Sequence, residues 1–302
     1  MQWPVAMGLR FSIVMPTLNR RDMLRRALAS VHAQAWPEIE IIVVDGGSTD
    51  GTIEEIAAQP NVRLIRGPDR GVYDAFNKGI GQADGDIVGI LNSDDLYEPS
   101  AFAAVAAAFS ANPDAAAVCG TAILVADGEI IAKFDAKRDK ALTSPRTALI
   151  GSCVPNARFF RRSAMQQVGP FSLDYRYVAD RDWLTRWYEA GLRTVAIDRL
   201  VYQYQQHQNS LTFDPQGRLR NAIRTEQLAL ALSWRDNEFA SPSTRHAAAL
   251  LEGRSRGTLA YEALRHGDVG EALKLLLMRN GHASLRPISS VLRATADRMI
   301  VR

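Results

Sequence analysis

Two neighbouring aspartates, Asp94 and Asp95, are the residues of this sequence with the clearest capacity for chemistry. They follow an apolar run at 87–91 and the polar pair Asn92-Ser93, so we expect them at the end of a buried strand. Adjacent carboxylates there repel one another and are poorly solvated, and a hard cation such as Mg²⁺ or Mn²⁺ neutralises them. The alternative is a helix N-cap for the segment after Pro99.

A second polar cluster, Asp45-Gly46-Gly47, follows the β-branched run at 39–44. Taken alone it is ordinary turn chemistry, and Asp50 is a good cap for a following helix. Ligands of open α/β sheets bind at the carboxyl ends of the strands, so the two clusters together predict one ligand site. A metal held there can bridge the two phosphates of a nucleotide and stabilise a departing diphosphate.

Strands and helices alternate through the residues that would position these clusters. Apolar and β-branched runs predict strands at 11–15, 39–44, 62–66 and 87–91. Helical spacing through Leu24, Leu28 and Val31 predicts the first helix, and further helices are expected at 52–58 and 75–83. This alternation implies a parallel sheet covered on both faces.

The following hundred residues are less regular. We predict a helix at 101–111, a hairpin of 117–125 with 129–134 around Asp127-Gly128, a helix at 182–190 and a strand at 194–197. Beyond Asp214-Pro215 the sequence is helical and Arg-rich, with almost no strand signal. The chain is therefore expected to contain a catalytic domain, residues 1–214, and a C-terminal helical region, residues 215–302.

Composition excludes several classes of protein. With 302 residues, 47% hydrophobic and 23% charged, the chain can bury a large α/β core and is not a disordered protein. It contains no run of about 18 apolar residues and no signal-peptide pattern, so we expect a cytoplasmic protein that does not span a membrane. The two cysteines, Cys119 and Cys153, lack zinc-site spacing and are expected to be buried thiols.

Charge is unevenly distributed along the chain. From Pro215 onward, 14 Lys and Arg face 8 Asp and Glu, a net charge of +6, whereas residues 1–214 carry −3. Residues 286–302 also place Ile288, Val291, Leu292 and Met299 near one helical face. Such a helix lies on an anionic membrane surface or packs in a small helical bundle. No nucleic-acid partner is expected.

Four ordered blocks of sequence resemble the family-2 glycosyltransferases, which have the GT-A fold. They are FSIVMPTLNR, EIEIIVVDGGSTDGT, DRGVYDAFNKGIGQADGDIVGILNSDD and YVADRDWLTRW, and they cover roughly the first two hundred residues. The resemblance implies an α/β fold with a mixed, mainly parallel sheet flanked by helices, followed here by the C-terminal helical segment. It also implies a nucleotide-diphospho-sugar donor and a divalent metal, Mn²⁺ or Mg²⁺.

The resemblance assigns roles to individual positions. It implies a pocket for the base and ribose of the donor, formed by Pro16, Thr17, Asn19 and Asp45. Asp95 matches the direct metal ligand, and Asp94 lies nearer the donor sugar or ribose and is a further metal candidate. Gly46, Asn92 and Ser93 are expected to line the same donor site. Asp180 matches the general base of inverting members, and Asp182 is the second candidate.

The sequence departs from the family pattern at three positions. Many relatives have Asp-Asp-Gly-Ser where this chain has Asp45-Gly46-Gly47-Ser48, so a carboxylate often assigned to base recognition is missing. Many also have an aspartate where this chain has Asn92, and an aromatic residue where it has Leu18. The first departure leaves the identity of the nucleotide open.

Five further polar residues are candidates. His207 is expected to return to the metal site as a ligand or a diphosphate contact, or to be a structural histidine. Arg70 and Lys78 flank the predicted helix, where one of them is expected to balance phosphate charge; a solvent-facing cation is the alternative. Asp74 and Asn77 either cap that helix or line the sugar site.

The expected function is therefore transfer of a sugar to a saccharide or lipid-linked acceptor in cell-surface polysaccharide biosynthesis, at the inner face of the membrane. A sugar-phosphate nucleotidyltransferase is disfavoured because the loop after the first strand is not Gly-rich. A dinucleotide-binding dehydrogenase is disfavoured because G-x-G-x-x-G is missing. A non-catalytic nucleotide-sugar-binding or assembly subunit with the same fold stays open as the alternative.

Overall fold

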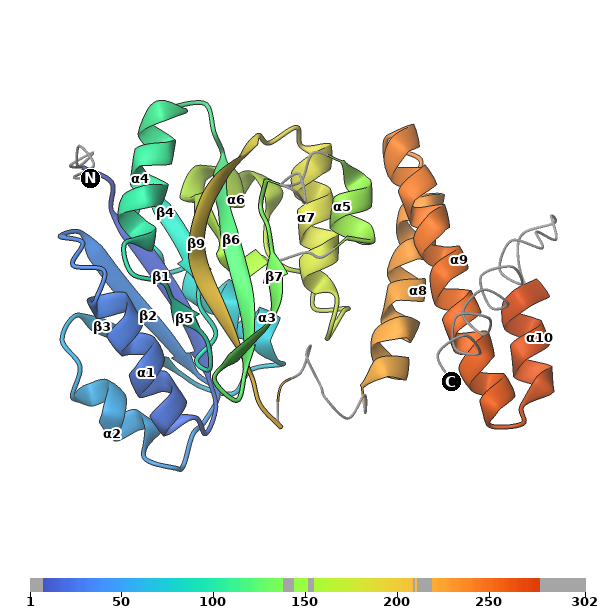
Figure 1. The fold of residues 1–302 in the computed structure, drawn as a ribbon, viewed down its shortest axis with the longest axis horizontal. Helices are drawn as coiled ribbons and strands as arrows, with labels where there is room; N and C mark the ends of the chain where they lie inside the picture. Colours follow the sequence, from blue (N-terminus) through green and yellow to red (C-terminus); the bar gives the residue numbers. More distant parts are fainter. Residues whose placement is uncertain (1–7, 138–143, 152–154, 209, 211–218, 278–302) are drawn as a thin grey trace. The chain divides into compact units, whose positions relative to one another are not determined.

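The computed structural model describes residues 8–137, 144–151, 155–208, 210 and 219–277 (Figure 1). The chain divides into two compact units, Met1–Phe213 and Asp214–Arg302. The boundary predicted at 214/215 falls within 211–218, outside the described residues, and so do Cys153 and the amphipathic segment 286–302. Cys119 is buried, as expected.

A nine-stranded sheet forms the first unit, with the order β3-β2-β1-β4-β8-β6-β9-β5 and with β7 paired to β6. The four strands predicted in the first hundred residues are present and mutually parallel. They are β1 (Phe11–Thr17), β2 (Ile39–Asp45), β3 (Val62–Arg66) and β4 (Ile87–Ile90). Their carboxyl ends therefore meet at one edge of the sheet, where the two polar clusters follow β2 and β4.

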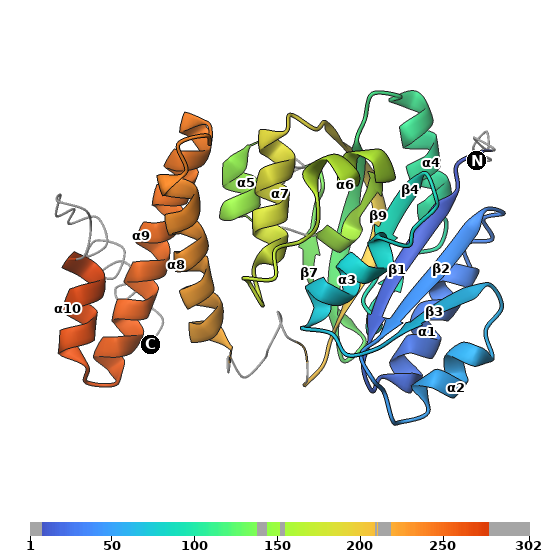
Figure 2. The same cartoon turned by 180° about the vertical axis from the view of Figure 1, so that it is seen from behind.

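Both faces of this sheet are buried, because successive side chains of a strand point to opposite faces. Ile13 belongs to a core with α1 (Arg21–His32), α2 (Thr52–Ala57) and α4 (Ala101–Ala111). Val14 belongs to the other core, and the helices that cover this side are α3 (Val72–Ile80), α6 (Arg162–Val168) and α7 (Ala179–Glu189). Figures 1 and 2 show these two faces from opposite sides.

The second half of the sheet mixes strand directions. β8 (Arg158–Arg161) is antiparallel to both β4 and β6, and β6 (Ala117–Ala126) forms the predicted hairpin with β7 (Glu129–Phe134). β9 (Thr194–Gln206) is parallel to β6, and the short β5 (Leu96–Tyr97) pairs antiparallel to β9. The sheet is thus mixed and mainly parallel in its first half, which confirms the predicted α/β fold.

The last strand of this unit is longer than expected. We predicted a strand at 194–197, but β9 continues to Gln206. Tyr202 and Tyr204 alternate with Gln203 and Gln205, which is the period-two pattern of a strand with one apolar face. The longer strand matters because it carries residues 202–206 alongside the loop that contains Asp94 and Asp95.

Two helices begin earlier than the sequence suggested, α3 at Val72 and α7 at Ala179. Asp74 lies in the first turn of α3, and Asp180 and Asp182 lie in the first turn of α7. Carboxylates are favourable there because they face the positive end of the helix dipole. The remaining short helices of this unit are α5 (Pro145–Leu149) and the 3₁₀ turn Pro155–Ala157.

Three helices make up the described part of the second unit: α8 (Arg220–Asp236), α9 (Pro242–Arg265) and α10 (Val269–Leu277). Ser241 caps α9 by accepting a hydrogen bond from the Thr244 amide, and Pro242 occupies the first helical position. Glu252, only 1% exposed, joins α8 to α9 because it pairs with Arg235 at 2.7 Å and Arg256 at 2.8 Å. Among the described residues, no helix has the length and apolarity needed to cross a bilayer.

Candidate active site

Asp95 is held in place by three hydrogen-bond donors. Its Oδ2 accepts from the Tyr202 hydroxyl at 2.7 Å and from Asn92 Nδ2 at 2.9 Å, and its Oδ1 accepts from the Gln205 amide at 2.9 Å. Burial, with a further contribution from the charge of Asp94, raises the pKa of Asp95 to about 7. This carboxyl is thus fixed in direction and costly to ionise without a nearby positive charge.

Asp94 faces two basic side chains. Its Oδ2 lies 2.8 Å from His207 Nε2 and also pairs with Arg20 Nη1. The proposed capping role is not observed, because α4 begins after Ser100 and has no side-chain cap. Arg20 was not among the expected site residues; its position just after β1, at the edge that carries both acidic clusters, was the signal that could have identified it.

Asn92 and Ser93 support the conformation of the loop that carries Asp94 and Asp95, and they add no further carboxylate to it. The Asn92 side-chain amide is used on Asp95 Oδ2, and the Asp95 amide donates to the Asn92 carbonyl at 3.1 Å. Ser93 is 2% exposed. An amide at position 92 can donate to Asp95 where an aspartate could not, so this departure from the family pattern helps to hold the buried carboxyl.

Asp45 organises the loop after β2. It is fully buried, and its Oδ1 accepts from the Gly47 amide at 3.1 Å and the Ser48 amide at 2.9 Å. Asn19, with a left-handed φ of 51°, ties this loop to the one after β1, since its Oδ1 accepts from the Thr49 amide at 2.8 Å. Both residues therefore act on the shape of the predicted nucleotide pocket.

The strand residues of the predicted pocket lie at the carboxyl end of β1. Pro16 and Thr17 are buried and register with Val44 and Asp45 of β2. The Thr17 Oγ1 atom is buried without a hydrogen-bond partner, and the Thr17 carbonyl accepts from the Gly46 amide at 3.0 Å. An unpaired buried hydroxyl is costly and calls for a partner, such as a bound ligand.

The candidates around α3 are mostly engaged in local structure. Asp74 Oδ2 accepts from the Arg70 amide and pairs with Lys78 Nζ, both at 3.0 Å, and these contacts lower the pKa of Asp74. Asn77 exchanges two hydrogen bonds with the backbone of Phe171, at 2.8 and 2.9 Å. The Arg70 side chain is exposed and is the cation of this group best placed for a ligand.

Asp180 occupies the first turn of α7 and faces α3. Its Oδ1 accepts from the Tyr73 hydroxyl at 3.2 Å and from the Arg181 amide at 2.9 Å. Burial raises the pKa of Asp180, and the neighbouring Arg181 charge only partly opposes this. The Arg181 guanidinium is directed away, to the carbonyls of Ala148, Leu149 and Gly151.

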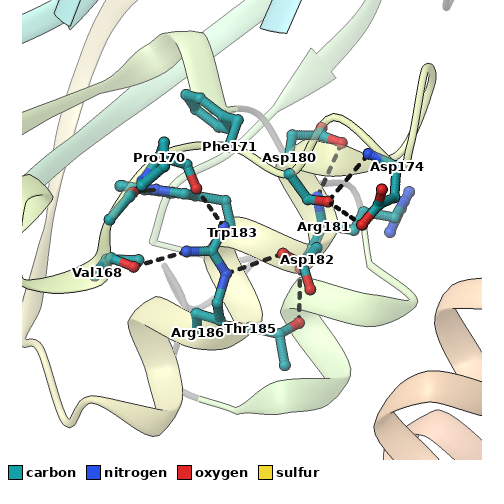
Figure 3. A network of polar contacts seen from close by, with 12 residues as sticks. Val168, Pro170, Phe171, Asp174, Asp180, Arg181, Asp182, Trp183, Thr185 and Arg186 are labelled. Atoms are coloured by element: carbon teal, nitrogen blue, oxygen red, sulfur yellow. Dashed lines mark hydrogen bonds and ion pairs between the residues drawn. The ribbon is translucent and has the colours of Figure 1, made fainter. Parts of the chain in front are cut away.

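Asp182 points elsewhere (Figure 3). It pairs with Arg186 at 2.9 Å, and Arg186 also donates to the carbonyls of Val168 at 2.7 Å and Pro170 at 2.8 Å. The Asp182 carboxylate is therefore part of the network that anchors the turn before Phe171 to α7. Of the two expected catalytic carboxylates, Asp180 accepts a hydrogen bond from the Tyr73 hydroxyl, whereas Asp182 pairs with Arg186.

Tyr204 links the Asp95 cluster to Asp180. Burial and then the charges of Asp95 and Asp180 raise the pKa of the Tyr204 hydroxyl, so both carboxylates lie in its surroundings. Its ring packs on that of Tyr202, with centroids 4.7 Å apart. Sequence reasoning missed Tyr73, Tyr202 and Tyr204, and the period-two pattern of β9 was the signal for the last two.

The acidic cluster is compatible with a metal ion whose coordination shell is completed by a substrate. Within the described ranges, no group of three or more His, Cys, Asp or Glu side chains is arranged to hold an ion. His207 nevertheless contacts Asp94 at 2.8 Å, and Asp95 is the next residue along the chain. Mg²⁺ is commonly held by one or two carboxylates together with waters and substrate phosphates. The residues present are compatible with that kind of site.

Comparison with known families decides the assignment. Residues 12–169 match the family described as glycosyl transferase family 2. This chain belongs to that family. It is therefore a glycosyltransferase, and the alternatives of a nucleotidyltransferase, a dehydrogenase or a non-catalytic subunit are not supported.

Individual relatives agree with the family assignment. The chain is 34% identical over 220 residues to the PGL/p-HBAD biosynthesis glycosyltransferase of Mycobacterium bovis (strain BCG / Pasteur 1173P2), covering 70% of this chain and 80% of the relative. It is 32% identical over 181 residues to an uncharacterized glycosyltransferase of Mycobacterium tuberculosis, covering 58% of this chain and 67% of the relative.

Solved structures show the same fold. The mannosyltransferase PcManGT from Pyrobaculum calidifontis, in complex with GDP-Man and Mn²⁺, matches with a TM-score of 0.62 at 21% identity. The match covers 100% of this chain and 84% of the mannosyltransferase chain. S. aureus TarS 1–349 in complex with UDP matches with a TM-score of 0.59 at 18% identity, and the match covers 90% of this chain and 76% of the TarS chain. The fold is accordingly GT-A-like.

Proposed function

We propose that this glycosyltransferase moves a sugar from a nucleoside-diphosphate donor to a hydroxyl of a saccharide or lipid-linked acceptor, with a divalent metal and with inversion at the anomeric carbon. The cluster of Asp94, Asp95, His207 and Arg20 carries the proposal. It offers oxygen and nitrogen ligands for a cation and a guanidinium for a phosphate. It also lies beside the carboxyl ends of β1 and β4, where this class of sheet binds ligands.

Asp95 and Asp94, with His207, are the residues that would hold the cation. When bound, Mn²⁺ or Mg²⁺ neutralises charge on the departing diphosphate. A structural relative was solved with GDP-Man and Mn²⁺ and another with UDP-GlcNAc, which supports a donor of this class. Arg20 pairs with Asp94 in the free protein, so its guanidinium is already positioned to turn toward a phosphate.

Asp180 is the proposed general base. Among the described residues, both donors to its carboxylate, the Tyr73 hydroxyl and the Arg181 amide, bind Oδ1, which leaves Oδ2 for the acceptor hydroxyl. Burial raises the pKa of Asp180 toward the range in which a carboxylate accepts a proton effectively. The acceptor oxygen attacks the anomeric carbon as Oδ2 takes its proton, and a single displacement of this kind inverts the configuration.

The acceptor is proposed to be lipid-linked or part of a cell-surface glycan, made at the inner face of the membrane. The mycobacterial relative, named for PGL/p-HBAD biosynthesis, supports a biosynthetic role. The net charge of +6 from Pro215 onward supports contact with an anionic surface. Deleting residues 286–302 is then expected to lower partitioning onto anionic vesicles while leaving neutral vesicles unaffected. Equal partitioning of the truncated and full chains would exclude this contact.

A nucleotide panel tests the proposed donor site. We expect Mn²⁺-dependent thermal stabilisation by one nucleoside diphosphate and its sugar, because a ligand at about 100 times its Kd stabilises a protein by roughly 2.7 kcal/mol. The panel contains UDP, GDP, CDP and ADP, each with and without Mn²⁺, followed by an assay of donor hydrolysis. Stabilisation by none of them, with no hydrolysis of their sugars, would argue against the proposed donor class.

A further inference from the structure

Gly46 is the position at which many relatives carry an additional carboxylate, and a neighbouring residue fills the space its side chain would take. A Cβ atom built on Gly46 would lie 2.6 Å from Asp69 Oδ2 and 3.7 Å from Leu18 Cδ1. Gly46 is not among the glycines with a left-handed φ, so its backbone would accept a side chain. A side chain at this position would meet the Asp69 carboxylate, which would have to move to make room for it.

Asp69 reaches this place from the loop between β3 and α3. Its Oδ1 accepts a hydrogen bond from the Gly71 amide at 2.8 Å, which fixes the carboxylate. The loop itself is tied to the end of β2, because the Gly67 amide donates to the Asp45 carbonyl at 3.1 Å. In the part of the chain that the structure describes, no donor is bonded to Asp69 Oδ2, and the residue is only partly exposed.

A second unpaired polar atom lies at the same strand ends. Thr17 Oγ1 is buried without a partner, and the Thr17 carbonyl is hydrogen-bonded to the Gly46 amide. The ends of β1, β2 and the β3–α3 loop thus present a hydroxyl and a carboxylate oxygen whose hydrogen-bonding capacity is unused. Unpaired polar groups of this kind favour a ligand that supplies the missing partners.

We propose that Asp69 recognises the base of the nucleotide donor, taking the place of the carboxylate missing at Gly46. The proposal rests on the proposed donor site. A carboxylate only accepts hydrogen bonds, so it favours a base whose edge carries a ring N–H, uracil or guanine. Cytosine and adenine present an unprotonated ring nitrogen at the corresponding position, which repels it. Base selection is therefore assigned to a residue outside the family's usual position.

Moving the carboxylate from position 69 to position 46 tests whether Asp69 recognises the base. We expect Asp69→Ala to weaken Mn²⁺-dependent binding of the preferred nucleoside diphosphate by about 10- to 100-fold, because a hydrogen bond to a charged group is lost. Binding of the disfavoured bases should change by less than about threefold. Gly46→Asp alone should also weaken binding, because the new side chain meets Asp69. The double variant Gly46→Asp/Asp69→Ala should recover the original preference.

The four diphosphates UDP, GDP, CDP and ADP are titrated calorimetrically against each variant, with Asp114→Ala as the control. The Asp114 side chain is 70% exposed and pairs with Arg193 at 2.6 Å. An unchanged base preference in Asp69→Ala, or equal losses for all four bases, would overturn the inference while the donor site stands. Binding of none of the four to the unaltered protein would instead count against the proposed function itself.

Discussion

Replacing Asp180 with asparagine is expected to lower kcat for sugar transfer by about 100- to 10,000-fold, the usual contribution of a positioned general base. Asparagine cannot take the acceptor proton. It keeps an oxygen that can accept from Tyr73 and from the Arg181 amide, so the first turn of α7 should be preserved. The Kd of the donor should be unchanged, because the proposed base acts on the acceptor hydroxyl and not on the nucleotide.

The matched control is Asp182→Asn, two positions along the same helix. Asp182 pairs with Arg186, so its loss should affect the turn that Arg186 anchors and lower stability by about 1 kcal/mol, with little change in kcat. Initial rates at saturating donor, together with donor Kd values, measure both variants. A larger loss of kcat in Asp182→Asn than in Asp180→Asn would reverse the assignment, and retention of the donor's anomeric configuration in the product would exclude the inverting mechanism.

Asp95→Asn is expected to abolish the Mn²⁺-dependent part of donor binding and to lower kcat/KM by about 1,000-fold, since metal stabilisation of a diphosphate supplies several kcal/mol. The side chain keeps its size, and its amide oxygen can accept from the Tyr202 hydroxyl and from Asn92 Nδ2 in place of Oδ2. Its Nδ2 then faces the Gln205 amide, so one lost hydrogen bond offsets the removal of a buried charge, and the metal-free stability should change by no more than about 1 kcal/mol at pH 8. Thermal unfolding with and without Mn²⁺ separates the two effects.

The same carboxyl predicts how metal binding depends on pH. With the pKa of Asp95 raised to about 7, its proton competes with the metal below that pH. The Kd for Mn²⁺ and nucleotide together should rise about tenfold per pH unit below 7 and level off above it. Titrations at pH 6, 7 and 8 measure this, with Asp182→Asn, which leaves Asp95 intact, as the control. A constant Kd across this range in the unaltered protein would contradict the assignment.

Much of the fold could be predicted from the sequence. The first four strands, the hairpin around Asp127-Gly128 and the helix at 101–111 lie where their periodicity placed them. Predictions were less accurate where the pattern was ambiguous. The strand predicted at 194–197 extends to Gln206, where Gln203 and Gln205 alternate with tyrosines in the pattern of a strand with one buried face.

The candidate site, like the fold, could be predicted from the sequence only in part. Asp94, Asp95 and Asp180 could be singled out because their types and local sequence are informative. Arg20 could not, since it approaches Asp94 from 74 residues away along the chain, and His207, 113 residues away, was singled out only because of the family resemblance. Asp69 was also missed, because what distinguishes it is the close approach of its carboxylate to Gly46. No local sequence pattern describes that approach.

Local residue patterns were therefore sufficient for the class of fold, the edge of the sheet that binds ligands and the acidic residues found there. This follows because hydrophobic periodicity and turn chemistry act over a few residues. Only the tertiary structure decided which carboxylate is buried, which is paired and which has an unused oxygen. Burial, pKa and hydrogen-bond saturation depend on atoms brought together from distant segments, here β1, the β3–α3 loop and β9, and sheet pairing determines those neighbours.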